Sequence, residues 1–161
     1  MADFAEEIEW FLTSFSPEEN AAMRHAFRAI VEGRPARIDE LPTVVGLSPA
    51  VIEEAVQRLT ERGVLVVEPD TGEITGARGI SLAETPHHLV LDGRQRYAFC
   101  AVDAVGIPAA LGISSRVESH CYHCKTPLSV TLVAGAVVDA LESMVIWAVE
   151  RDMSRSLRAH T

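Results

Sequence analysis

Two serine–proline steps divide the first half of the sequence into helices with defined starts. Ser16-Pro17, followed by Glu19, has the pattern of a capping box, and Ser48-Pro49 has the pattern of a second helix start. Gly33 and Gly63 follow the apolar stripes of these helices and predict their ends. This part of the chain is therefore expected to fold as short, separately capped helices.

The segments around these helices complete a definite order of elements. Residues 38–45 predict a short helical turn, and residues 64–67 and 73–75 predict two strands joined by a turn at 69–72. Helix, short helix, helix and hairpin is the order of a winged helix-turn-helix. A further amphipathic helix is expected before them, over residues 2–15.

The charge of this half argues against DNA binding. Residues 1–80 carry fifteen acidic against seven basic residues, a net charge of −8, whereas residues 81–161 carry eight against seven. A helix that reads the major groove needs cations for the phosphates. The second capped helix instead carries Glu53, Glu54 and Glu61 against Arg58 and Arg62. Nucleic acid is therefore disfavoured as a partner.

All three cysteines fall within residues 97–127. The odd number favours free thiols over a disulfide framework. The acidic N-terminus is unlike a signal peptide, and no window of 18 uncharged apolar residues is present. We therefore expect a cytoplasmic protein without a membrane span.

Cys100 and Asp103 form the first candidate site. If residues 97–105 are helical, their i, i+3 spacing puts both side chains on one face, so that a carboxylate can exchange a proton with a thiol. The alternative is that Cys100 is a small buried core residue, which is a common place for cysteine.

Two thiols and two imidazoles within five residues form the second candidate site, His120-Cys121-Tyr122-His123-Cys124. A structural zinc ion would take Cys121 and Cys124 as half of its ligands. The other two would come from Cys100, His120, His123, His87 or His88. The same Cys-x-x-Cys spacing also fits a thiol–disulfide oxidoreductase.

The second half of the sequence predicts strands around the cysteine-bearing helix. Strands are expected within residues 80–91, 116–118, 128–133 and 144–149, and the tail from 150 is polar. The expected fold class is α+β, with a mixed or antiparallel sheet. We expect a winged-helix-like domain over residues 1–78 and a core domain over residues 79–161.

Several segments of this core resemble the bacterial organomercurial (alkylmercury) lyases. The similar segments run in order from residues 79–85, through 94–103 (RQRYAFCAVD), 107–112 and 116–121, to 126–131. The resemblance covers roughly residues 21–149 and is strongest between 79 and 131. The winged-helix-like start also resembles the N-terminal domain of that family.

The resemblance implies protonolysis of carbon–mercury bonds, and thus a role in mercury detoxification. Cys100 matches the cysteine that binds mercury as a thiolate, and Asp103 matches the aspartate that takes the thiol proton and delivers it to carbon. Cys121 matches a buried structural cysteine. No cofactor is implied: Hg(II) is the metal of substrate and product, and the partners are an organomercurial and cellular thiols.

The family also uses a second catalytic cysteine in a downstream Cys-Cys-His-rich segment, and no such segment occurs up to Thr161. We therefore expect a short member in which Cys124 or an external thiol takes that role, or in which cleavage is lost. Cys100 and Cys124 are the expected mercury ligands, ahead of Cys121 and His123. The alternative functions are a non-catalytic Hg, Zn or Cu binding protein and a metal-responsive winged-helix regulator.

Overall fold

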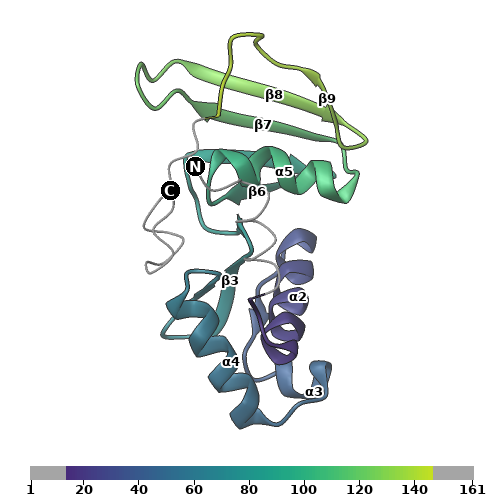
Figure 1. Ribbon diagram of the computed structural model, residues 1–161, viewed down its shortest axis with the longest axis vertical. Coiled ribbons are helices and arrows are strands. Elements are labelled where there is room, and N and C mark those ends of the chain that lie inside the picture. Colours follow the sequence, from purple (N-terminus) through teal and green to yellow (C-terminus); the bar gives the residue numbers. More distant parts are fainter. Residues whose placement is uncertain (1–13, 147–161) are drawn as a thin grey trace.

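The computed structural model describes residues 14–146 (Figure 1). Its helices are α2 (Pro17–Glu32), α3 (Leu41–Val45), α4 (Pro49–Glu61) and α5 (Ala101–Leu111). Its strands are β1 (Ala36–Arg37), β2 (Leu65–Val67), β3 (Glu73–Ala77), β4 (Ile80–Ser81), β5 (His87–Leu91), β6 (Arg94–Ala98), β7 (Ser115–His120), β8 (Pro127–Val133) and β9 (Ala136–Asp139). None of the helices in this part of the chain is long and apolar enough to cross a membrane.

The predicted helix caps of the first half are confirmed. Ser16 Oγ accepts from Glu19 N at 3.2 Å, while Glu19 Oε2 accepts from Ser16 N at 2.8 Å, so the capping box at the start of α2 is complete. Gly33, with φ +91°, ends α2 in the left-handed conformation. Ser48 Oγ caps α4 by accepting from Val51 N.

The strands described form one nine-stranded sheet in which every neighbouring pair is antiparallel. The order is β1-β3-β4-β6-β5-β7-β8-β9, with β2 also paired to β3. The α+β class and the β2–β3 hairpin are confirmed, and the sheet is antiparallel rather than mixed. The assignment of α2–α4 and the hairpin to a winged helix stays a prediction.

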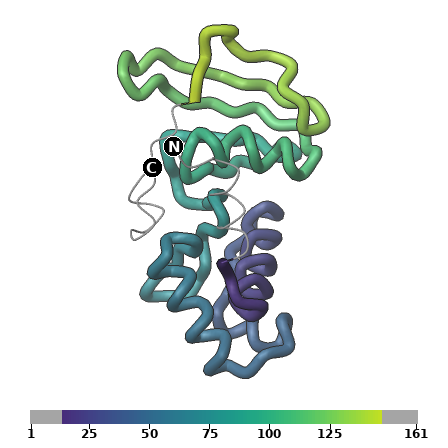
Figure 2. Tube along the Cα trace, in the orientation of Figure 1, coloured from purple at the N-terminus to yellow at the C-terminus, as the bar shows by residue number. Residues whose placement is uncertain are grey.

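Helices α2, α3 and α4 gather at one end of the long axis, and α5 lies at the other end beside β6–β9 (Figure 1). The trace in Figure 2 passes from the first end to the second through the β3–β4 connection. One cluster of buried side chains spans both ends, including Met23 and Ile52 at the first and Leu89 and Leu132 at the second. The division at residue 78 stays a prediction, and the sheet crosses this position.

The expected helix over residues 97–105 is wrong in its first turn. Tyr97 and Ala98 belong to β6, which pairs with β5 across a tight turn at Asp92 and Gly93. Both turn residues have positive φ, +46° and +74°, as a two-residue hairpin turn requires. The chain therefore reverses and forms another strand, and α5 begins only at Ala101.

The last expected strand, over residues 144–149, is also wrong within the described part, because residues 144–146 are irregular. The turn at Ala134 and Gly135, with φ of +49° and +80°, instead forms a hairpin that places β9 against β8. Residues 147–149, the first part of the predicted helix over 2–15, and the tail from 150 lie outside the described residues.

Arg96 joins the two ends of the molecule. It lies on β6, is only 4% exposed, and donates from Nε to Ile30 O at 2.6 Å and from Nη2 to Val31 O at 2.9 Å. These carbonyls belong to the last turn of α2, where a helix lacks amides to pair with all of its carbonyls. Ile30 O also accepts from the C-cap amide of Gly33 at 3.0 Å. The cationic guanidinium also complements the negative end of the helix dipole.

Replacing Arg96 by methionine should lower the free energy of unfolding by about 2 kcal/mol, because Val31 O loses the guanidinium donor and Ile30 O keeps only the amide of Gly33. Urea denaturation followed by circular dichroism measures the change. Arg94→Met is the matched control: Arg94 Nη1 donates to Glu32 O at 2.5 Å from an exposed position, so its loss should cost less than about 1 kcal/mol. Equal losses from the two variants would contradict this role of Arg96.

Candidate active site

Cys100 is the N-cap of α5. Its backbone is extended, with φ −148° and ψ 172°, and its Sγ accepts from the backbone N of Asp103 at 3.4 Å. This is the position that Ser, Thr, Asp or Asn usually fills, because an N-cap side chain satisfies a free amide of the first turn. The same Sγ donates to Asp103 Oδ2 at 3.0 Å. The predicted thiol–carboxylate contact is therefore present, although it arises at the helix start.

Gly79, in the turn before β4, lies directly against the carboxylate of Asp103. A Cβ at this position would lie 2.4 Å from both Cγ and Oδ1 of Asp103, so the carboxylate fills the space that a side chain would take. Gly79 has φ +89°, a conformation that favours glycine, and its carbonyl accepts from Phe99 N at 2.8 Å. Sequence reasoning missed this residue, and the Arg78-Gly79 turn before β4 was the available signal.

His87 stands beside this pair. It lies on β5 with the same alternation as the buried Leu89 and Leu91, and its Nδ1 is 2.8 Å from Ser119 Oγ. Burial lowers the pKa of His87 more than the negative charge of Asp103 raises it. The sequence singled out His87 only as a candidate metal ligand. The structure makes it a neutral neighbour of Asp103 at neutral pH.

Burial is the main reason that the Cys100 thiol stays protonated. Desolvation, followed by the negative charge of Asp103 and the hydrogen bond to it, raises the pKa of Cys100 to about 11. A neutral thiol thus faces a carboxylate that can accept its proton. Such a pair becomes reactive when a soft cation replaces the proton on sulfur, because metal binding deprotonates a thiol.

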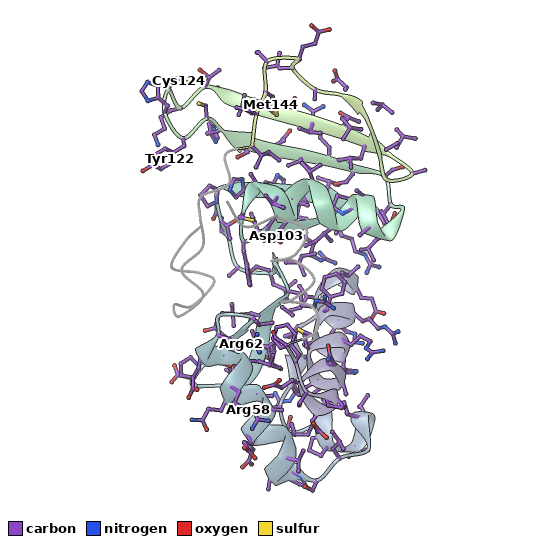
Figure 3. All side chains as sticks on the ribbon, in the orientation of Figure 1. Arg58, Arg62, Asp103, Tyr122, Cys124 and Met144 are labelled. Atoms are coloured by element: carbon purple, nitrogen blue, oxygen red, sulfur yellow. The ribbon has the colours of Figure 1, made fainter. Side chains whose placement is uncertain are left out.

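The other two cysteines form a separate pair in the turn between β7 and β8. Cys124 is exposed, and its Sγ lies 3.1 Å from Thr126 Oγ1. Hydrogen bonds from Thr126, and then one from the Cys121 side chain, lower the pKa of Cys124 to about 7. Figure 3 shows Cys124 at the tip of this hairpin, apart from Asp103 in α5. His123 is exposed in the same turn.

No group of three or more His, Cys, Asp and Glu side chains that could hold a metal ion occurs in residues 14–146. His88 Nδ1 lies 3.6 Å from Glu118 Oε2, and the His88 ring is 5.5 Å from that of Tyr97. His120 is exposed at the end of β7. Within this range, the structure brings Cys100 into contact with Asp103 and places Cys121 and Cys124 in one turn, and it adds no histidine to either pair as a third ligand.

The alkylmercury lyase (MerB) family model matches residues 80–160, half of the chain. This chain belongs to the alkylmercury lyase family. The match takes in Cys100, Asp103, His87 and both cysteines of the β7–β8 turn, and Gly79 directly precedes it.

Individual members of the alkylmercury lyase family agree. The alkylmercury lyase of Pseudomonas putida is 34% identical over 139 residues, which are 80% of this chain and 60% of that protein. The alkylmercury lyase of Streptomyces lividans is 32% identical over 114 residues, 68% of this chain and 48% of that protein. The chain thus spans about half to two thirds of the length of these curated relatives.

A solved structure has the same fold. The crystal structure of the mercury-bound form of MerB2 aligns with a TM-score of 0.87 at 27% identity. The alignment covers 94% of this chain and 73% of that one. The described part of this chain therefore shares the fold of a family member that was solved in a mercury-bound form.

The two kinds of thiol should differ in alkylation by iodoacetamide at pH 7. Cys124, with a pKa of about 7, is half ionised, whereas Cys100, with a pKa of about 11, is thiolate in about one molecule in ten thousand. The weaker nucleophilicity of the more acidic thiolate offsets part of this difference, so Cys124 should react about 100-fold faster.

Mass spectrometry of the labelled peptides measures both rates as a function of pH. The rate at Cys124 should rise through pH 7 and level off, while the rate at Cys100 should still be rising at pH 10, because deprotonation creates the nucleophile in each case. In urea the two rates should converge. A faster Cys100 in the folded protein would contradict the burial of its thiol as the cause.

Proposed function

We propose that this chain cleaves carbon–mercury bonds by protonolysis at Cys100 and Asp103. The observation that carries the proposal is the 3.0 Å contact between the Cys100 thiol and Asp103 Oδ2, in a chain of the alkylmercury lyase family. A nucleophile and a proton acceptor in direct contact are what the reaction requires.

In the first step, mercury of an organomercurial cation RHg⁺ bonds to Cys100 Sγ, and the thiol proton passes to Asp103. Sulfur is the preferred donor for so soft a metal, so mercury displaces the proton in spite of the high pKa of Cys100. The charge of the cation is balanced by the single negative charge of the pair, which lies on Asp103 before the proton moves and on the Cys100 sulfur afterwards. The amide of Asp103, 3.4 Å from the sulfur, stays in place to support the thiolate.

In the second step, a further thiolate coordinates mercury, and the protonated Asp103 delivers its proton to the carbon. The carbon–mercury bond breaks, its electron pair forms the new C–H bond, and the hydrocarbon leaves. Hg(II) remains on two sulfurs, and Asp103 is again a carboxylate. Thiol exchange then removes Hg(II), and Cys100 recovers a proton, so the cycle needs no cofactor beyond the substrate's own metal.

The second thiolate is assigned to a small cellular thiol. Cys124 is the candidate within the sequence, but its contacts are with Thr126 and Cys121 in the β7–β8 turn, and not with Cys100. A small thiol from solution has no such constraint. The reducing cytoplasm, where thiols are abundant, is the matching location for this reaction.

Phenylmercury with excess small thiol should therefore yield benzene, measured in the headspace by gas chromatography. Cys100→Ser should abolish release, because oxygen is a poor ligand for mercury. Asp103→Asn should still bind mercury but release benzene about 100-fold to 10,000-fold more slowly, because the proton carrier is lost.

Three results would oppose this scheme. Wild-type rates in Asp103→Asn would exclude the proton transfer, and tight mercury binding without benzene from the unaltered chain would favour a non-catalytic binding protein. Release of one equivalent of benzene per chain without any added thiol would indicate that Cys124, and not a small thiol, is the second ligand of mercury. Circular dichroism of each variant should match the parent, so that loss of folding does not imitate loss of chemistry.

Gly79→Ala should impair cleavage through Asp103 alone. The new Cβ would overlap the carboxylate, and kcat/KM should fall at least about 10-fold because the proton carrier is displaced. Gly93→Ala is the matched control: its φ is +74°, against +89° at Gly79, but its Cβ would meet nothing within 4 Å. Both variants carry backbone strain, so equal losses of activity would show that the contact with Asp103 is unimportant.

A further inference from the structure

The turn between β7 and β8 is built as a single helical turn that carries two thiols. Lys125 N donates to Cys121 O at 2.9 Å, an i+4 to i bond, and Cys121 N donates to Thr126 O at 2.9 Å. Lys125 has φ +59°, which lets the chain turn back into β8. In one helical turn, residues three apart share a face, so the bond from Lys125 N to Cys121 O places the side chains of Cys121 and Cys124 on the same side of the turn.

The two cysteines lie in a solvent-exposed turn, and the paired strands β7 and β8 hold its two ends. Cys124 is exposed and Cys121 is half-buried, while Tyr122 between them is 92% exposed with Lys125 Nζ 4.8 Å from its ring centroid. Figure 3 shows Cys124 and Tyr122 projecting at the tip of the hairpin. The β7–β8 ladder, with His120 opposite Pro127, holds both ends of the turn. A metal ion in solution can therefore reach both sulfurs without a change in the fold.

The chemistry of the pair selects the ion. Four-coordinate zinc needs two more ligands, and no group of three or more candidate ligands is found in residues 14–146. Hg(II) is satisfied by two thiolates in a linear arrangement, and soft sulfur ligands are its preference. Two sulfurs with no third His, Cys, Asp or Glu side chain grouped with them in the described part of the chain match a two-coordinate soft dication.

We propose that Cys121 and Cys124 form a second metal site, which binds inorganic Hg(II) as a dithiolate separately from Cys100 and Asp103. Two S–H bonds break, two Hg–S bonds form, and two protons pass to solvent, so no oxidant or reductant is needed. The second Hg–S bond forms within one turn of chain, at a high effective thiol concentration, and the pair therefore outcompetes monothiols. The site does not depend on carbon–mercury cleavage.

The test uses the full chain with Cys100→Ser, so that mercury at the candidate active site does not contribute. The protein is mixed with one equivalent of HgCl₂ and excess 2-mercaptoethanol, separated by gel filtration, and analysed for mercury per chain. One Hg(II) per chain should remain. Adding Cys124→Ser or Cys121→Ser should weaken retention against the monothiol about 100-fold, because the chelate is lost.

Tyr122→Phe in the same Cys100→Ser background is the control, because it changes the turn without touching a sulfur, and it should retain mercury fully. If Cys121→Ser fails to fold, Cys124→Ser decides alone, since that side chain is exposed. Any of four results would overturn the proposal. The first two are equal mercury retention without Cys124 and no retention by the Cys100→Ser parent. The other two are mercury shared between two chains in sedimentation and a Cys121–Cys124 disulfide in the reduced sample.

Discussion

A thiol in hydrogen-bonding contact with a carboxylate, removed from most of the solvent, is the arrangement on which the candidate chemistry depends. Water would separate the two groups and solvate the carboxylate, so the protein has to hold them together. It does so with main-chain features: the first turn of α5 orients Cys100 toward Asp103, and the bare Cα of Gly79 lies against the carboxylate. The β5–β6 hairpin in turn fixes where α5 starts.

Much of this arrangement could be predicted from short stretches of the sequence. The caps at Ser16 and Ser48 and the spacing of Cys100 and Asp103 depend on neighbouring residues only, and a sequence displays such features directly. The start of α5 was misplaced because Tyr97 and Ala98 are equally compatible with a helix or a strand, and only pairing with β5 decides between them. Gly79 and Ser119 lie far from Cys100 in the sequence, so the turn at Gly79 is visible locally but its contact with Asp103 is not.

The cysteines illustrate how strongly environment separates identical side chains. Cys100 is desolvated beside a negative charge and is held as a thiol, whereas Cys124 stands in water with hydrogen bonds to its sulfur and ionises near neutrality. Spacing assigns them to different candidate sites, but it does not show how far their acidities differ. Burial and hydrogen-bond partners depend on the tertiary structure. They make Cys100 a thiol that can pass its proton to Asp103, and they make Cys124 an exposed thiolate that can bind a metal ion.

Arg96 has a consequence for any attempt to reduce this protein to a minimal catalytic scaffold. A fragment that kept only the strands around α5 would strip β4 of β3 and leave a buried guanidinium without the carbonyls of α2. The last turn of α2 therefore supplies hydrogen-bond acceptors to the strand that leads into Cys100. A designer who wished to shorten the chain would have to redesign β6 first.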